Sequence, residues 1–256
     1  MSRGATDEVG VSAPPGAVGT GAEIAGVFAH DGRRHEIERI RYMGPRAGHE
    51  PVRIAIFAGV HGDEPAGTAA LRLFLKSLLE DPVRATGYEL FAYPAVNPVG
   101  LERGTRENCA GLDLNREFWK GSRQPEVLII ENELSTHRFN GLIALHADDS
   151  CEGTYGYSHG NAMEDSLLRP ALVAAEAVLP RDKRSSIDGF HAHEGIITDC
   201  FQGILAPPPG QHPRPFNLIF ETPAGVPLDI QAAAHVAALD AILATYRGYI
   251  SYAGDL

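Results

Sequence analysis

Two kinds of hydrophobic pattern alternate along the 256-residue chain. Short and nearly continuous apolar runs, typical of strands buried on both faces of a sheet, lie at 52–58, 90–96, 142–145 and 217–220. Apolar residues at helical spacing lie at 65–79, 125–137, 166–178 and 229–246. This alternation predicts an α/β fold: a single domain with a mixed, mostly parallel sheet and helices on both faces.

The N-terminal region gives two further expectations. Residues 1–22 are rich in Gly, Ala, Pro and Ser and lack periodicity, so we expect a flexible tail. Two strand-like runs between 26 and 40 flank Asp31-Gly32, a dipeptide that favours a hairpin turn. Since no linker interrupts the rest of the chain, residues 23–256 are predicted to form one domain.

Composition limits the classes of partner. Hydrophobic residues make up 44% of the chain, enough for a full core, and the net charge of −11 argues against affinity for nucleic acid or an anionic membrane. No run of about eighteen apolar residues predicts a membrane span. Three cysteines and an N-terminus without a signal-peptide pattern favour reduced thiols and a cytoplasmic protein.

Polar side chains follow four of the predicted strands, at the points where the strands end. They are His61, Asn97, His146 and Glu221. Ligands of open α/β sheets bind in the crevice beyond the carboxyl ends of the strands. We therefore expect these four side chains to converge on one crevice.

The segment His61-Gly-Asp-Glu64-Pro indicates a metal site. An imidazole and a carboxylate three residues apart can reach one point, and a third ligand from another strand leaves a fourth position open for water, as in catalytic zinc sites. His146 is the candidate third ligand. A histidine at the position of His61 alone is more often a capping or buried residue, and the combination with Glu64 and His146 favours zinc.

Two further groups carry chemistry. The irregular stretch 97–118 contains arginines, whose planar forks bind carboxylates through paired hydrogen bonds. For Arg103, the alternative to binding a carboxylate is a position at the surface. Glu221, at the end of an apolar strand, can move a proton near a metal, or it can instead favour the N-terminus of the following helix.

Together these residues carry a resemblance to the zinc carboxypeptidase family, which includes the succinylglutamate desuccinylase and aspartoacylase branch. The segments that match, in order, are His61-Gly-Asp-Glu64, Asn97-Pro-x-Gly100, Arg106-x-Asn108-x-x-Gly111-x-Asp113-x-Asn115-Arg116-x-Phe118, Leu145-His146 and Phe220-Glu221. The resemblance implies a sheet of about eight strands and a zinc-hydrolase catalytic domain over 23–256.

The resemblance also implies a role for each residue. One zinc ion is expected on His61, Glu64 and His146, with Glu221 as general base and proton shuttle and Arg106 polarising the scissile carbonyl. Asn115 and Arg116 are expected to hold the substrate's carboxylate, and Asp113 to orient His61 or the arginine loop. The family's mobile tyrosine has no evident counterpart, although Tyr155 and Tyr157 follow His146 closely. His191 and His193 allow either a second metal site or a place on a surface loop.

The expected activity is hydrolysis of an amide bond next to a free carboxylate, at a peptide C-terminus or in a murein-type peptide. An N-acyl amino acid deacylase is the alternative, although members of that branch carry a β-rich domain after the catalytic glutamate and only residues 222–256 follow here. A relative that binds metal or ligand without catalysis is the third possibility, and it would not need both Glu221 and Arg106. Side-chain specificity is expected from the loops 149–160 and 190–215, and oligomeric state stays open.

Overall fold

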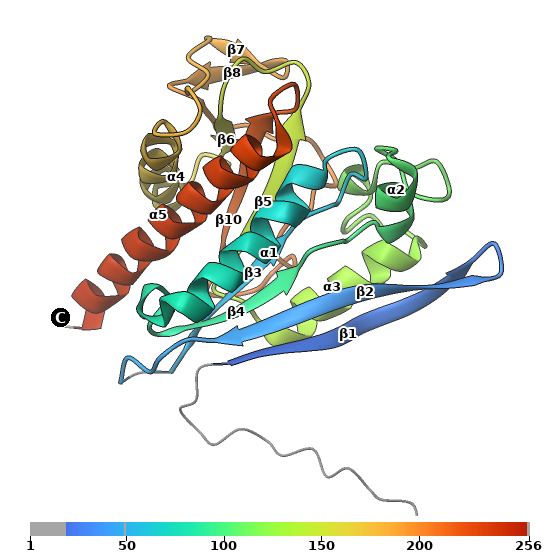
Figure 1. The fold of residues 1–256 in the computed structure, drawn as a ribbon, viewed down its shortest axis with the longest axis horizontal. Helices are drawn as coiled ribbons and strands as arrows, with labels where there is room; N and C mark the ends of the chain where they lie inside the picture. Colours follow the sequence, from blue (N-terminus) through green and yellow to red (C-terminus); the bar gives the residue numbers. More distant parts are fainter. Residues whose placement is uncertain (1–18, 49, 255–256) are drawn as a thin grey trace, which may run out of the picture.

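The computed structural model describes residues 19–48 and 50–254, so most of the predicted tail lies outside the described residues. One mixed sheet of ten strands runs through the molecule in the order β1-β2-β4-β3-β5-β10-β6-β9-β8-β7 (Figure 1). The strands are β1 (Gly19–His30), β2 (Arg33–Met43), β3 (Val52–Phe57), β4 (Tyr88–Tyr93), β5 (Gly141–Asp148), β6 (Tyr155–Tyr157), β7 (Ser186–Ile187), β8 (Phe190–His193), β9 (Ile196–Ile197) and β10 (Phe216–Pro223). The helices are α1 (Pro65–Glu80), α2 (Pro98–Arg103), α3 (Pro125–His137), α4 (Ala162–Ala175) and α5 (Leu228–Gly254), with short 3-10 turns at Pro82–Ala85 and Leu114–Arg116.

The central strands β4, β3, β5 and β10 are parallel, as the continuous apolar runs predict. The strands outside them, β2 on one side and β6 on the other, run antiparallel to their central neighbours. The α/β class, the mixed sheet and the single domain are therefore confirmed. The sheet has ten strands in place of about eight, because β7 and β9 are two-residue segments that no hydrophobic pattern marks.

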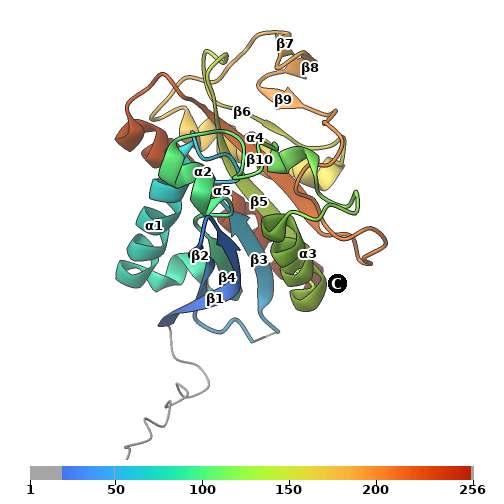
Figure 2. The ribbon, with the colours of Figure 1, turned by 90° about the vertical axis from the view of Figure 1, so that its right-hand side faces the viewer.

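Helices cover both faces of the sheet (Figure 2). On one face α1, α4 and α5 bury the apolar side chains of the larger core, and on the other α3 packs with Val127, Ile130 and Leu134. Helix α5 is long and apolar enough, over Leu228–Ser251, to meet the length and composition of a membrane span. Its packing against α1 and α4 accounts for that composition, because Ala238 and Ile242 are fully buried in the core.

The predicted hairpin forms the blue edge of the sheet in Figure 1. Asp31 and Gly32, with φ of 50° and 71°, make the turn between β1 and β2. A two-residue turn with both φ values positive matches the twist of the strands, which explains the Asp-Gly pair. Strand β1 begins at Gly19, so residues 19–22, assigned to the tail from sequence, extend the hairpin.

Candidate active site

A cavity of about 390 Å³ lies beyond the carboxyl ends of the central strands. The predicted residues that line it are His61, Glu64, Arg106, Asn115, Arg116, His146 and Glu221. Asn97 was expected to join them, and that expectation is wrong. Its side chain instead accepts a hydrogen bond from the Gly100 N–H at 2.9 Å and caps α2.

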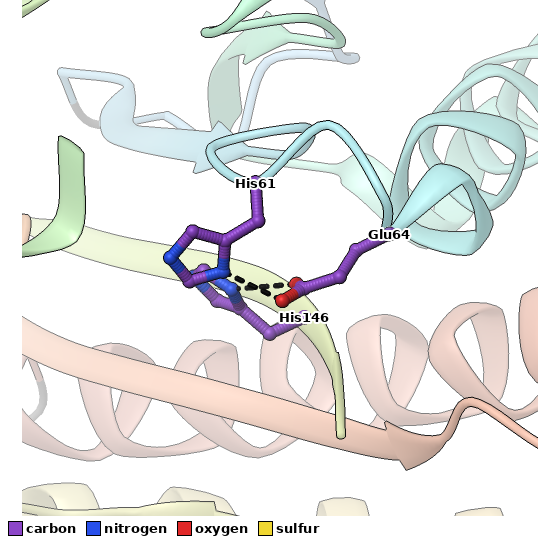
Figure 3. Close-up of side chains that lie close together, drawn as sticks. All are labelled: His61, Glu64 and His146. Atoms are coloured by element: carbon purple, nitrogen blue, oxygen red, sulfur yellow. Dashed lines mark hydrogen bonds and ion pairs between the residues drawn. The ribbon is translucent and has the colours of Figure 1, made fainter. Parts of the chain in front are cut away.

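His61, Glu64 and His146 line the cavity, and their side chains come together at one point (Figure 3). Each offers one donor atom, and these atoms all lie within 4.8 Å of one another. The Glu64 carboxylate stands between the two rings, with 2.6 Å from Oε1 to His61 Nδ1 and 2.8 Å from Oε2 to His146 Nδ1. All three side chains are buried.

Close backbone packing fixes the loop that carries two of the ligands. Gly62 donates its N–H to the Thr105 carbonyl at 2.9 Å. A Cβ at Gly62 would stand 1.9 Å from the Gly100 carbonyl carbon, so a side chain has no room here. Close contact with α2 therefore explains the glycine at position 62, whereas Gly59 in the same loop has a positive φ, at 60°.

The donor set fits a zinc ion. At 2.6 and 2.8 Å from Glu64, each Nδ1 either carries a proton that it donates or shares a metal ion with the carboxylate. Without metal, a proton on Nδ1 lets each ring donate to Glu64. Burial lowers the pKa of His61, but the hydrogen bonds that His61 donates to Asp113 and Glu64 outweigh burial and raise its pKa to about 9. Burial lowers the pKa of His146. Two histidines and one glutamate are the ligands of catalytic zinc in carboxypeptidase A.

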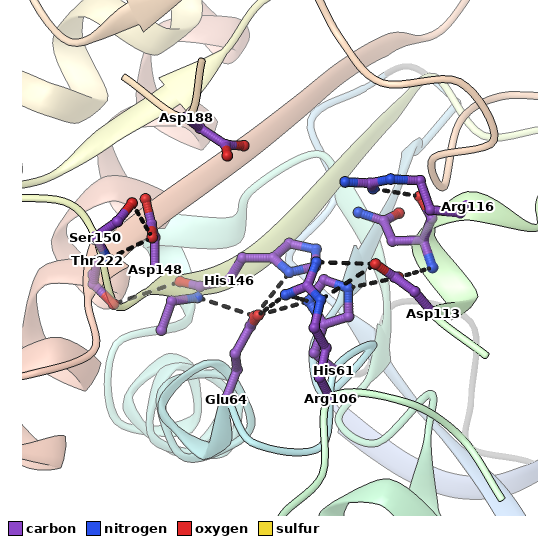
Figure 4. A network of polar contacts seen from close by, with 12 residues as sticks. His61, Glu64, Arg106, Asp113, Arg116, His146, Asp148, Ser150, Asp188 and Thr222 are labelled. Atoms are coloured by element: carbon purple, nitrogen blue, oxygen red, sulfur yellow. Dashed lines mark hydrogen bonds and ion pairs between the residues drawn. The ribbon is translucent and has the colours of Figure 1, made fainter. Parts of the chain in front are cut away.

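Asp113 contacts both His61 and Arg106, the two alternatives that the sequence left open (Figure 4). Its Oδ1 accepts from His61 Nε2 at 3.0 Å, which fixes the ring with Nδ1 on the side of Glu64 and His146, where a metal ion would bind. Its Oδ2 accepts from Arg106 Nη2 at 3.0 Å, and its Oδ1 also caps the Asn115 N–H at 2.8 Å. Despite burial, these contacts hold the pKa of Asp113 well below its usual range.

The two arginines reach the cavity in different ways. Arg106 forms ion pairs with both Asp113 and Glu64. Its Nη1 lies 3.4 Å from Glu64 Oε1. Arg116 stacks over the Phe201 ring, with 3.9 Å from Cζ to the centroid, and donates to the Asn115 carbonyl at 2.9 Å. Asn115 is buried, and its Oδ1 accepts from the Leu205 N–H at 2.8 Å. Asn115 therefore ties the arginine segment to the loop that carries Phe201.

Glu221 is only 9% exposed and lines the cavity, and its side chain has no hydrogen bond within the described part of the chain. It lies beside His146, its register partner on β5. Burial, and after it the charges of Glu64 and Asp148, raises the pKa of Glu221 well above its ordinary value. A raised pKa suits a carboxylate that takes up a proton and gives it back.

The loops predicted as pocket walls do line the cavity, and two residues just outside them, Asp148 and Asp188, line it as well. Tyr155 donates to Asp148 at 3.0 Å, and Tyr157 donates to Asp188 at 2.6 Å. Asp148 follows His146 by two residues on the same strand, which is a signal the sequence offered. Asp188 has none, because it stands in a turn far along the chain.

The histidine pair His191 and His193 lies on β8 and is exposed. Among the described residues, the His61, Glu64 and His146 group is the one that brings three potential ligands together. Their side chains are at the surface, as one of the two expected alternatives has it, but they stand on a short strand and not on a loop. Arg103 is also at the surface, 3.4 Å from Asp31.

Comparisons with known proteins agree with this geometry. The sequence model of the succinylglutamate desuccinylase/aspartoacylase catalytic domain matches residues 51–152, which include all three ligands. Carboxypeptidase D of Rattus norvegicus is 31% identical over 113 residues, covering 38% of this chain and 8% of that protein. The chain thus matches only a small part of the length of these curated relatives.

Solved structures match over most of the chain. A protein of Shewanella amazonensis described as a metallopeptidase superposes with a TM-score of 0.70 at 24% identity, covering 88% of this chain and 86% of that one. A metallo-carboxypeptidase of Pseudomonas aeruginosa, in complex with (2-guanidinoethylmercapto)succinic acid, gives 0.67 at 19% identity, covering 88% and 64%. The chain has a zinc-carboxypeptidase fold. Within it, His61, Glu64 and His146 form the ligand set of a single zinc site.

Proposed function

We propose that the protein is a zinc-dependent hydrolase of the metallocarboxypeptidase type, which cleaves the amide bond next to a free carboxylate at the end of a peptide. The observation that carries the proposal is the position of Glu221. A buried carboxylate without a hydrogen-bond partner is costly, and here it stands in the cavity beside the buried ligand His146. Proton transfer at a metal centre gives that arrangement a use.

The chain's own residues divide the work of the reaction. A bound zinc ion supplies Lewis-acid polarisation and makes water a stronger nucleophile at neutral pH. Glu221 takes the proton from the attacking water and delivers it to the leaving nitrogen. Arg106, already within 3.4 Å of Glu64, stabilises the negative charge that develops on the carbonyl oxygen.

Recognition of the substrate's carboxylate belongs to the other arginine. Arg116 has its guanidinium held flat by Phe201 and by the Asn115 carbonyl, so the fork is fixed before substrate arrives. A fixed fork binds a carboxylate through two parallel hydrogen bonds at little entropic cost. Asn115 positions the same segment through Leu205.

An N-acyl amino acid deacylase is the second candidate. The match of the desuccinylase/aspartoacylase domain over residues 51–152 favours it, because that segment holds the three ligands and both arginines. The same groups would act on an acyl amide bond. The two candidates differ in what lies on the nitrogen side and the acyl side of the scissile bond.

The test measures metal content and hydrolysis of two substrate sets, C-terminal dipeptides and N-acyl amino acids, for the wild type and Glu221→Gln. We expect about one zinc per chain, cleavage of dipeptides, and a loss of about 10²- to 10⁴-fold in kcat for the variant. Cleavage of the acyl set alone would move the protein to the deacylase branch. Turnover that does not depend on Glu221 would refute the mechanism.

A further inference from the structure

A small polar network lies behind the metal site, on the face of the sheet that α5 covers. Side chains alternate along β10, so Glu221 faces the cavity while Thr222, the next residue, points toward α5. There the Thr222 hydroxyl contacts Gln231 and His235 of that helix. All three side chains are buried against the larger apolar core. Polar groups in such a place cost free energy unless they are paired, so their pairing needs an explanation.

The hydrogen bonds of this network have one consistent direction. Gln231 Nε2 donates to the Val226 carbonyl at 2.6 Å and to the Ala224 carbonyl at 3.3 Å, which leaves Gln231 Oε1 as an acceptor. The Thr222 hydroxyl therefore donates to that oxygen, at 3.1 Å. Because a hydroxyl has one proton, it accepts at the same time from His235 Nε2, at 3.2 Å. The proton of the His235 ring is thus assigned to Nε2 by its partners.

The network carries no charge near neutral pH. Burial lowers the pKa of His235 to about 3, so the ring stays neutral. In this tautomer Nδ1 has only a lone pair, and it has no partner among the described residues. The ring packs edge-on against Phe220, with 5.6 Å between centroids, which restricts its orientation. What a neutral and restrained network supplies to the neighbouring site is position.

The network reaches both strands that carry the reacting groups. Thr222 follows Glu221 on β10, and its hydroxyl lies 3.5 Å from the carbonyl oxygen of His146 on β5 (Figure 4). The N–H of the same peptide group belongs to Ala147, and it donates to Glu64 Oε2 at 3.0 Å. One peptide group of β5 therefore stands between a metal ligand on its N–H side and Thr222 on its oxygen side.

We propose that Thr222 and His235 are positioning residues of the metal site, which fix the end of β10 that carries Glu221 against the end of β5 that carries His146. The inference rests on the proposed function, in which Glu221 moves the protons. Such a group has to be held to within about 0.5 Å of its productive position. Apolar contacts are non-directional, whereas hydrogen bonds fix both distance and angle, so the network sets a position that core packing alone leaves loose.

The experiment compares Thr222→Val, which keeps the shape of the side chain and removes the hydroxyl, with Thr222→Ser, which keeps the hydroxyl. We expect Thr222→Val to lower kcat about 10- to 100-fold on the substrate set that the wild type hydrolyses, because a reacting group is displaced. KM should change by less than about threefold, since Asn115 and Arg116 belong to another element. Thr222→Ser should restore most of kcat.

Two further comparisons separate position from stability. Thr154→Val is the matched control, because Thr154 is equally buried and its hydroxyl contacts the Pro180 carbonyl, so the change should lower the thermal unfolding temperature and leave kcat as it is. If Thr222→Val does not fold, His235→Gln and His235→Leu take the place of the first pair. Glutamine keeps an N–H donor near the position of Nε2, and leucine has none.

A spectroscopic measurement separates this inference from the proposed function. Cobalt bound in place of zinc gives visible absorption bands that depend on the geometry of its ligands. A band shift in Thr222→Val that Thr222→Ser reverses supports the inference, even if neither substrate set is hydrolysed and the proposed function fails. A loss of kcat that serine restores supports it as well. An unchanged cobalt spectrum together with unchanged kcat, or with no hydrolysis to measure, overturns it, and so does a Thr222→Ser protein as impaired as Thr222→Val.

Discussion

Replacement of Asp113 by asparagine tests how much the metal site depends on a residue that does not itself bind metal. In the structure the carboxylate accepts from His61 Nε2 at 3.0 Å and from Arg106 Nη2 at 3.0 Å. Asparagine keeps the size of the side chain and the cap on the Asn115 N–H. It removes the charge that favours the His61 tautomer with the proton on Nε2, and its amide group opposes Arg106.

The expected result is weaker zinc binding. Removal of a carboxylate that orients a histidine ligand typically lowers metal affinity about 10- to 100-fold, which corresponds to about 1.4–2.7 kcal/mol. Because Arg106 loses its partner at the same time, its guanidinium can turn toward Glu64 and oppose the metal further. We therefore expect a loss near the upper end of that range.

The assay is competition for zinc with a chromophoric chelator at fixed pH, together with thermal unfolding of the metal-free protein to show that the variant is folded. Asp240→Asn is the matched control, since Asp240 forms an ion pair with Arg84 far from the cavity lining. A folded Asp113→Asn protein that binds zinc as tightly as the wild type would contradict the role derived from the geometry.

Three further predictions concern recognition, packing and pH. Arg116→Lys keeps the charge but loses the fork, so KM for dipeptides should rise about tenfold, with a smaller change in kcat in steady-state assays. Gly62→Ala places a Cβ 1.9 Å from the Gly100 carbonyl carbon, and denaturant unfolding should show a loss of about 1–3 kcal/mol together with weaker zinc binding. Burial raises the pKa of Glu164 to about 7. Between pH 4.5 and 7 the folded chain therefore keeps a proton that the unfolded chain releases, and the free energy of unfolding falls as the pH rises through this range. Glu164→Gln, which can still accept from the Asn217 N–H, should therefore gain up to about 3 kcal/mol on the wild type between pH 4.5 and 8.

The sequence predicts best the elements that have a long run of periodic apolar residues and a residue at the boundary, such as proline, that begins or ends the element. Helix α3 spans Pro125–His137 as predicted, because a proline begins it and Arg138, with φ of 50°, ends it. Helix α4 begins at Ala162, four residues before the predicted start at 166. Its start is set by the Asn161 side chain, which caps the Met163 N–H at 2.9 Å, and not by the apolar spacing.

The metal site could be predicted because its geometry is nearly local. His61 and Glu64 belong to one loop that leads into α1, and His146 stands on β5, the next strand along the sheet. The strand order also explains the position of Glu221, because Glu221 on β10 pairs in register with His146 on β5. Each of these positions follows from which residues end a buried strand.

Substrate recognition depends on contacts that no local pattern contains. Asp188 reaches the cavity because β7 pairs with β8, β8 with β9, and β9 with β6. Each of these three pairings, which together position the turn of Asp188, involves only two residue pairs. A two-residue pairing has too few apolar positions for a sequence period to mark it. The residues that choose a substrate can therefore change by loop substitution while the ligands on the central strands stay in place. The fold and the metal ligands alone point to an amide hydrolase, so the distinction between a peptidase and a deacylase has to come from residues on these short strands and loops.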